Sequence, residues 1–152
     1  MIFKRLENKE IETAKKLYDI WQQSYIVEKE LLGAVEFPPL NRLESDFIKS
    51  ENNFQGFYEN KELLGVVEID SKMNSVHIQS LVVDPSHFRK GIATKLIQKV
   101  FDLYPSLTYT VETGNNNIPA KKLYESVGFR KSKIWNAEFG IEKIKYEKIT
   151  AK

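Results

Sequence analysis

The spacing of apolar residues along the chain switches between two periods, and each period predicts one kind of element. Strict alternation and short β-branched or aromatic runs, which are typical of strands, occur in seven segments. These segments are residues 1–6, 54–59, 62–70, 75–83, 107–113, 129–136 and 138–149. The alternation changes phase between Ile141 and Ile144, which predicts a bulge or bend in the last segment.

Four other segments repeat apolar residues every three or four positions, which predicts helices. They cover residues 11–24, 41–50, 91–104 and 119–127. Asn8 is placed to cap the first of these helices. Residues 25–40 lack a regular period and contain two consecutive prolines, so they are predicted to form an irregular loop. Such a loop is either a plain surface connection or a source of substrate contacts.

The order of these elements predicts a mixed sheet. Short polar turns join residues 54–59, 62–70 and 75–83, which should therefore form an antiparallel meander. A helix separates residues 75–83 from 107–113, so these two strands should run parallel through a right-handed crossover. Ligands of such units bind beyond the carboxyl ends of the strands.

Composition excludes several classes of protein. At 152 residues, with 41% hydrophobic and 12% aromatic residues, the chain is expected to be one globular domain. It has no cysteine and only two histidines, so neither thiolate catalysis nor a metal site is expected. The net charge of +2 argues against a nucleic-acid binder. No apolar run is long enough for a membrane span or a signal peptide, so a cytoplasmic protein without membrane contact is expected.

The turn that follows residues 75–83 has the features of an anion site. Asp84-Pro85 ends the strand, and Gly91 and Ala93 leave backbone amides uncovered where the next helix begins. Arg89 and Lys90 add positive charge there, so the turn could bind a phosphate group. Alone, the same pattern also fits an ordinary strand-to-helix turn. It matches neither the P-loop nor the dinucleotide-binding fingerprint.

Two motifs and the order of the elements resemble the GCN5-related N-acetyltransferase (GNAT) family. The first motif is FRKGIA, residues 88–93, after Val83-Asp84-Pro85. The second is NIPAKKLY, residues 117–124, followed by Gly128-Phe129. Phe88 stands where the family has Gln or Arg, which removes one side-chain contact but keeps the small residues of the loop. The resemblance covers essentially the whole chain, so residues 1–152 are expected to be a single acetyltransferase domain.

The resemblance implies an α/β fold, with a mostly antiparallel sheet that contains one splayed parallel pair and is flanked by about four helices. It also implies acetyl-CoA as cosubstrate, with the pyrophosphate on the loop amides and the pantetheine arm paired to the strand before the loop. The residues expected to bind it are Leu81, Val82, Val83, Arg89, Lys90, Gly91, Ile92, Ala93, Thr94, Asn117, Ala120 and Tyr124.

In this family a neutral amine attacks the acetyl carbonyl directly, so the resemblance implies no enzyme nucleophile. Tyr124 should donate a proton to the departing thiolate, since a phenol is protonated at neutral pH. The backbone amide near Val82 could stabilise the oxyanion. Many relatives carry a general-base Glu on the central strand, where this chain has Gln79. The base is therefore expected to be Glu68, and the alternatives are Glu112, His77 or water.

The absence of a strong base on the central strand bears on the acceptor. At pH 7 a lysine-like amine is ~0.04% neutral and an α-amine ~10% neutral. The predicted function is therefore N-acetylation of a small primary amine, such as an amino acid. The alternatives are a protein N-terminal acetyltransferase and a non-catalytic acyl-CoA sensor. The acceptor should contact Tyr25, Glu28, Gln79 and the last hairpin near Trp135, in a monomer or homodimer.

Overall fold

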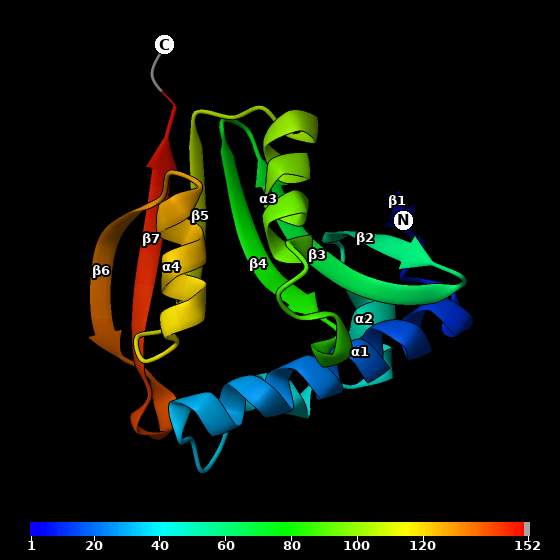
Figure 1. The fold of residues 1–152 in the computed structure, drawn as a ribbon, viewed down its shortest axis with the longest axis horizontal. Helices are drawn as coiled ribbons and strands as arrows, with labels where there is room; N and C mark the ends of the chain where they lie inside the picture. Colours follow the sequence, from blue (N-terminus) through cyan, green and yellow to red (C-terminus); the bar gives the residue numbers. More distant parts are fainter. Residues whose placement is uncertain (151–152) are drawn as a thin grey trace.

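The computed structural model describes residues 1–150, which form one mixed sheet with helices on both faces (Figure 1). Within this range the sheet has seven strands in the spatial order β1-β2-β3-β4-β5-β7-β6. The strands are β1 (Ile2–Leu6), β2 (Asn53–Glu59), β3 (Glu62–Lys72), β4 (Ser75–Val83), β5 (Thr108–Gly114), β6 (Arg130–Asn136) and β7 (Glu142–Ile149). Among the strands of residues 1–150 only β4 and β5 pair in parallel, so the predicted α/β fold and its one parallel pair are confirmed.

The helices lie in two layers (Figure 1). They are α1 (Ile11–Leu32), α2 (Glu44–Lys49), α3 (Ile92–Leu103) and α4 (Ile118–Ser126), with short 3₁₀ turns η1 (Pro38–Asn41), η2 (Pro85–His87) and η3 (Glu138–Gly140). Helices α3 and α4 cover one face of the sheet, while α1 and α2 pack on the other. No helix within residues 1–150 is both long enough and apolar enough to cross a membrane.

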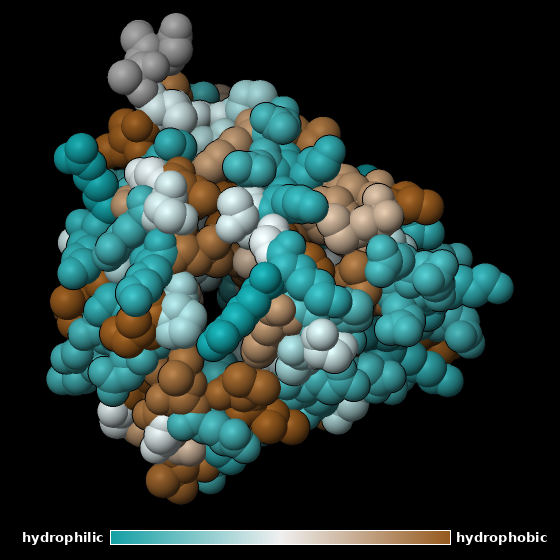
Figure 2. Space-filling view, viewed as in Figure 1, coloured by the Kyte–Doolittle hydropathy of each residue, from teal (hydrophilic) through white to brown (hydrophobic). Residues whose placement is uncertain are grey.

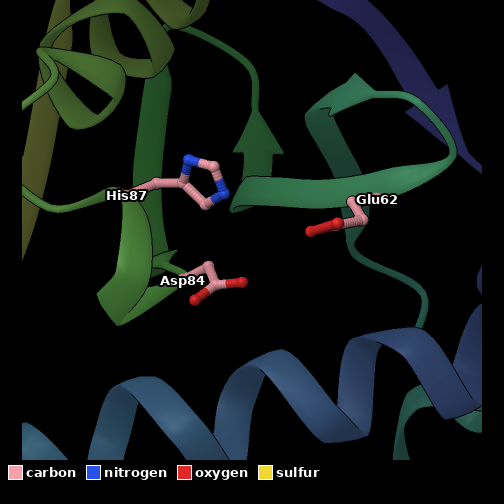
Figure 3. Close-up of side chains that lie close together, drawn as sticks. All are labelled: Glu62, Asp84 and His87. Atoms are coloured by element: carbon pink, nitrogen blue, oxygen red, sulfur yellow. The ribbon is translucent and has the colours of Figure 1, made fainter.

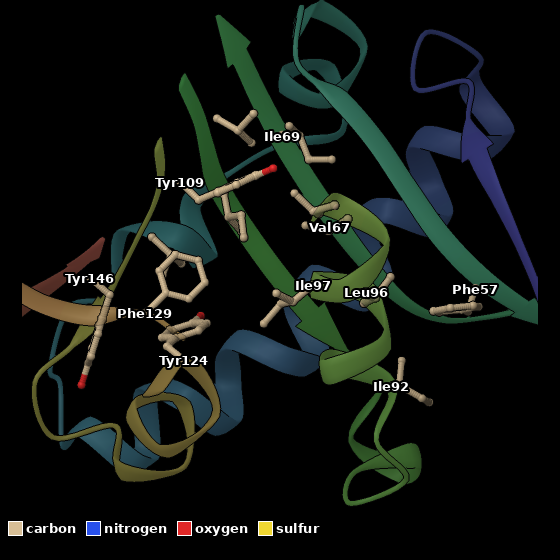
Figure 4. Close-up of a cluster of buried hydrophobic side chains, with 14 of the residues drawn as sticks. Phe57, Val67, Ile69, Ile92, Leu96, Ile97, Tyr109, Tyr124, Phe129 and Tyr146 are labelled. Atoms are coloured by element: carbon tan, nitrogen blue, oxygen red, sulfur yellow. The ribbon is translucent and has the colours of Figure 1, made fainter. Parts of the chain in front are cut away.

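Each face of the sheet buries its own apolar core. Under α3 and α4, aromatic rings from α4, β5 and β7 pack against the aliphatic stripe of α3 (Figure 4). Under α1 and α2, Trp21 meets Phe47 and Phe54 edge to face, with ring centroids 4.9 and 6.0 Å apart. The helices are amphipathic because each contributes one apolar stripe to one core, as their sequence period indicates.

Strands β4 and β5 pair over only part of their length. Ser75–Ile78 pairs with Thr108–Val111, and no pairing continues beyond Ile78. The register of β4 against β3 shifts at the same place, where Glu68 lies opposite Ser80 and Ile69 opposite Ile78. Gln79 is thus the extra residue of a β-bulge, and a bulge bends its strand. The two strands therefore diverge toward their carboxyl ends, as the family resemblance implied.

The bulge also changes which side chains face which core. Before it, Val76 and Ile78 belong to the core beneath α3 and α4. After it, Leu81 and Val83 pack on that core, while Val82 is buried in the core beneath α1. One extra residue shifts the two-residue alternation of a strand by one position.

The prediction that the first helix ends near Ser24 was wrong. Helix α1 continues to Leu32 and ends at Gly33, whose φ of 65° is the left-handed conformation common at helix ends. The apolar stripe weakens after Ser24 because the second half of α1 leaves the core, and Tyr25 and Glu28 face cavities instead. Residues 33–43 still connect α1 to α2 irregularly, and the two prolines begin η1.

Asn8 does not cap α1, contrary to the prediction. The N-cap of α1 is Glu10, which makes no side-chain capping hydrogen bond. Asn8 is instead buried, and its Nδ2 donates to the carbonyl oxygens of Phe47 at 2.7 Å and Ser50 at 3.1 Å. These carbonyls belong to the last turn of α2, so Asn8 joins the start of the chain to α2 rather than to the adjacent helix.

The irregularity predicted between Ile141 and Ile144 lies elsewhere. Residues 138–140 form η3 rather than strand, because Phe139 and Gly140 adopt φ values of 59° and 72°. From Lys143 onward β7 pairs regularly with β5, and the register shift in the last hairpin falls in β6, between Lys131 and Lys133.

Replacing Asn8 with alanine should destabilise the fold, because it leaves two buried carbonyl groups without their donor. The expected loss is about 2 kcal/mol, or roughly 4–8 °C in Tm for a domain of this size. Thermal unfolding of Asn8→Ala checks this, with Asn136→Ala, at an exposed asparagine, as control. Equal Tm values for the two variants would contradict the role assigned to Asn8.

Candidate functional site

The divergence of β4 and β5 opens a cavity of about 570 Å³, which we call the apolar cavity. In the space-filling view the surface is hollowed between α4 and the turn before α3 (Figure 2). The lining is mainly apolar and comes from α1, β4, β5, α3 and α4. It includes Val27, Leu31, Leu81, Val83, Ile92, Val111 and Leu123. A narrow, largely apolar chain could therefore lie between the two strands.

Six consecutive backbone amides at the start of α3 have no hydrogen-bond acceptor among residues 1–150. They are the amides of Arg89 to Thr94, and the first amide of this region to find an acceptor is that of Lys95, which donates to the Gly91 carbonyl. Arg89 and Gly91 adopt φ values of 65° and 75°, which turn the chain into the helix. Free amides and a positive helix end together favour an anion at the mouth of the apolar cavity.

Three side chains that could ligate a metal meet just before these amides (Figure 3). Candidate ligand atoms of Glu62, Asp84 and His87 all lie within 4.8 Å of one another. Asp84 already accepts hydrogen bonds from the backbone and the hydroxyl of Ser86, both at 2.9 Å. Nδ1 of His87 lies 3.2 Å from Nζ of Lys90. These contacts order the turn that carries the free amides.

Ten of the twelve residues predicted to bind acetyl-CoA line the apolar cavity. They are Leu81, Val83, Arg89, Gly91, Ile92, Ala93, Thr94, Asn117, Ala120 and Tyr124. The side chain of Val82 is buried under α1 instead, and Lys90 is exposed beside His87. Asn117 caps α4 by accepting from the Ala120 amide at 3.2 Å, and it donates to Thr113 Oγ1 at 3.3 Å.

Tyr124 presents an unused hydroxyl to this cavity. The residue is 5% exposed, and its ring packs against Phe129 and Tyr146 with centroids 5.9 and 5.8 Å apart. Its hydroxyl makes no hydrogen bond within residues 1–150, yet it is not sealed from solvent. Burial raises the pKa of Tyr124, and the nearby Glu28 carboxylate raises it further. The phenol is therefore protonated at neutral pH and available as a donor.

A second cavity of about 690 Å³ adjoins the first, and we call it the acidic cavity. Four carboxylates line it, those of Glu28, Glu68, Glu112 and Glu138, together with the aromatic rings of Trp21, Tyr25 and Phe37. Six residues line both cavities and so form their common wall: Tyr25, Glu28, Gln79, Ser80, Glu112 and Thr113. The three residues predicted to bind the acceptor, Tyr25, Glu28 and Gln79, are all in this wall.

The rest of the predicted acceptor site is only partly brought together. The last hairpin contributes Ala137, Glu138, Ile141 and Lys143 to the acidic cavity. Trp135 does not line it and lies beside the ammonium groups of Lys133 and Lys143.

Two carboxylates of the acidic cavity are held by cations. Arg42 donates from Nη1 to Glu68 Oε1 at 2.7 Å and from Nη2 to Oε2 at 3.0 Å, while Asn52 donates to Oε2 at 2.9 Å. Glu68 is 1% exposed, and the guanidinium of Arg42 lies over the Phe47 ring. Nζ of Lys143 lies 3.4 Å from Glu112 Oε1. No local pattern in the sequence points to Arg42, because its partner Glu68 lies 26 residues away and comes close only through the fold.

The titratable groups that line the acidic cavity differ in their environment. Burial raises the pKa of Glu28 to about 7, although the Lys143 ammonium opposes the shift. Burial also raises the pKa of Tyr25. Burial lowers the pKa of His77, whose Nδ1 lies 2.7 Å from Thr110 Oγ1, so this imidazole is neutral near pH 7. The carboxyl group of Glu28 thus changes charge near neutral pH.

Comparison with known proteins places these features in one family. The profile of the Acetyltransferase (GNAT) family matches residues 14–129. The chain is 34% identical over 137 residues to the UPF0157 protein YqkA of Bacillus subtilis (strain 168), covering 90% of this chain and 40% of that protein. It is 37% identical over 78 residues to a streptothricin acetyltransferase of Escherichia coli, covering 49% of this chain and 45% of that protein. The chain thus spans less than half the length of these two relatives.

Solved structures agree with the family profile in fold. The ribosomal-protein-S18-alanine N-acetyltransferase from Escherichia coli superposes with a TM-score of 0.75 at 20% identity, covering 97% of this chain and 92% of that one. The PaiA N-acetyltransferase from Thermoplasma acidophilum, solved in complex with coenzyme A, gives 0.74 at 16% identity, covering 99% of this chain and 100% of that one. With the profile match over most of its length, the chain belongs to the GNAT family of acetyltransferases.

Proposed function

We propose that this protein transfers the acetyl group of acetyl-CoA to the primary amine of a small molecule. The observation that carries the proposal is the pair of cavities that share one wall. The apolar cavity ends at the free amides of α3, and the acidic cavity lies on the other side of Tyr25 and Glu28. An anionic, elongated cosubstrate and a cationic acceptor could thus meet at a common wall.

The apolar cavity suits the chemical parts of acetyl-CoA. The amides of Arg89 to Thr94 would bind the pyrophosphate, since six unpaired donors at a helix start favour an anion. The edge of β4 that faces β5 is unpaired past Ile78, so the amide groups of a pantetheine arm could hydrogen-bond to it as an added strand would. Coenzyme A in the PaiA structure supports this choice of cosubstrate.

Tyr124 is the proposed proton donor to the thiolate. The acceptor nitrogen attacks the acetyl carbon, and the carbon–sulfur bond breaks as the tetrahedral intermediate collapses. The hydroxyl of Tyr124 is protonated, faces the apolar cavity and has no other partner within residues 1–150. A positioned acid of this kind typically accelerates a reaction by 10²–10⁴-fold.

The charges of the acidic cavity favour an amine without a carboxylate beside it. Its two cations, Arg42 and Lys143, each already neutralise a glutamate. The carboxylates of Glu28 and Glu138 have no such partner within residues 1–150. A free amino acid would bring its own carboxylate into this cavity and find no unpaired cation there. A small cationic amine is therefore the better fit.

The rival function is acetylation of a protein N-terminus, which the resemblance in fold to the ribosomal-protein acetyltransferase favours. The two are separated by measuring thiol release from acetyl-CoA with small amines, free amino acids and short peptides. We expect release with amines that lack a carboxylate. Release only with peptides would establish the rival. A thermal shift with acetyl-CoA but no release from any acceptor would instead indicate a sensor.

Replacing Tyr124 with phenylalanine should lower kcat by about 10²-fold, because the thiolate then leaves without a proton donor. Binding of acetyl-CoA should be retained, since only a hydroxyl is removed. A hundredfold excess over Kd should stabilise wild type and Tyr124→Phe alike by about 2.7 kcal/mol. Tyr18→Phe, on α1 and outside both cavities, is the matched control. An unchanged kcat in Tyr124→Phe would contradict the proposed role of Tyr124 as proton donor.

The ion pair between Arg42 and Glu68 should act chiefly on stability. Arg42→Ala leaves the buried Glu68 carboxylate without its cation and should cost about 3 kcal/mol of unfolding free energy. The double variant Arg42→Ala with Glu68→Gln should recover most of this loss, because the second change removes the unpaired charge. Denaturant unfolding of the single and double variants tests the coupling, and additive losses would contradict it.

A further inference from the structure

We propose that Glu28 accepts the proton that the acceptor nitrogen loses as it becomes acetylated. The inference rests on the proposed function and adds a general base in place of Gln79, whose side-chain amide cannot accept a proton. The base then lies in the second half of α1, a segment in which the spacing of apolar residues did not indicate a catalytic role.

Position favours Glu28 over the other carboxylates. Glu28 lies one helical turn after Tyr25 on α1 and lines both cavities, so it borders both the acceptor and the cosubstrate. Glu68 lines only the acidic cavity, and Glu138 also lines only that cavity and is exposed. Glu112 is the other carboxylate in the common wall.

Availability separates Glu28 from Glu112 and Glu68. Within residues 1–150, the carboxylate of Glu28 accepts no hydrogen bond and has no cation within 4.0 Å. Lys143 lies 3.4 Å from Glu112, and both oxygens of Glu68 accept from Arg42. A carboxylate paired closely with a cation gives up that interaction when it takes a proton, whereas Glu28 has no such close partner within residues 1–150.

The surroundings of Glu28 suit a base that works near neutral pH. The titratable and charged groups that line the two cavities with Glu28 come from several elements. They are Tyr25 on its own helix, Arg42 after η1, Glu68 on β3, His77 on β4, His87 and Arg89 before α3, Glu112 on β5, Tyr124 on α4, Glu138 in η3 and Lys143 on β7. Burial raises the pKa of Glu28 to about 7, and Lys143 opposes the shift. The group is therefore a carboxylate above this pH and is more basic than an ordinary glutamate.

The protons of the reaction balance when Glu28 and Tyr124 both take part. The acceptor reacts as its neutral amine, so its nitrogen–carbon bond forms while the carbon–sulfur bond breaks. The nitrogen passes one proton to the Glu28 carboxylate, and the thiolate takes the proton of Tyr124. The protonated Glu28 then returns its proton to the Tyr124 oxygen, directly or through water. The products are the amide and the free thiol, and both side chains recover their starting states.

The test is the pH dependence of kcat/KM for Glu28→Gln with an amine that supports thiol release. In wild type, ionisation of the amine and of Glu28 should combine to give a slope of about 2 in log kcat/KM below pH 7, falling to about 1 above it. In Glu28→Gln the slope should stay near 1, and kcat/KM at pH 8 should fall about 10²-fold. Glu30→Gln, exposed on the same helix and outside both cavities, should behave as wild type.

Several outcomes would overturn the assignment. One is a Glu28→Gln variant that keeps the change of slope near pH 7 and loses less than threefold in kcat/KM. Another is loss of the change of slope in Glu112→Gln or Glu68→Gln but not in Glu28→Gln. In both cases wild-type acetylation would persist, so the proposed function would stand without Glu28. If no acceptor supports thiol release by the wild type, both the proposed function and this assignment are contradicted.

A second variant guards against a folding defect in Glu28→Gln. Glu28→Asp keeps the carboxylate but withdraws it by one methylene, so the change of slope should remain while kcat/KM falls. Thermal unfolding with and without acetyl-CoA shows whether each variant still folds and binds the cosubstrate. A folded Glu28→Asp variant that loses the change of slope would contradict the assignment. A Glu28→Gln variant that keeps the change of slope would contradict it equally.

Discussion

The bulge at Gln79 is the feature on which the rest of the site depends. An extra residue in β4 bends the strand where its parallel pairing with β5 ends. The bend opens the apolar cavity, leaves one edge of β4 unpaired and turns Leu81 and Val83 toward that cavity. A regular strand would have continued its ladder along β5, and no space for a ligand would exist between them.

The bulge is tolerated because both faces of the sheet remain packed around it. Ile78 before the bulge and Val82 after it are each about 1% exposed, but they belong to opposite cores. The shift in alternation therefore buries apolar side chains on both sides instead of exposing them. The sheet that holds the two cores together thus also contains the bulge that opens the apolar cavity.

Helix α1 connects the core to the proposed chemistry. Its first half buries Leu17 and Trp21 under the sheet, and its second half carries Tyr25 and Glu28 into the wall between the cavities. A helix anchored by a core fixes such side chains more firmly than a loop can. The same continuity explains why burial affects the ionisation of Glu28, since the helix holds this carboxyl group away from bulk water.

The elements of the sheet and the free amides of the turn before α3 could be predicted from the sequence, because both leave local signals. The parallel pair followed from the helix between residues 83 and 107, and the free amides followed from Gly91 and Ala93. The length of α1 could not be predicted from the sequence, because a helix that borders a cavity lacks the apolar stripe of a packed helix. The roles of Asn8 and Arg42 depend on partners 39 and 26 residues away, to which no local pattern points.

The most direct test of the central claim is hydrogen exchange of backbone amides with and without coenzyme A. The proposed ligand lies between β4 and β5, with its phosphates on the amides of Arg89 to Thr94. These amides have no acceptor in the protein within residues 1–150, so they should exchange quickly alone and slowly with the ligand. The amides of Leu81 and Val83, which point to the unpaired edge of β4, should be protected as well. Binding that protects neither segment, or protects a distant one, would contradict the account.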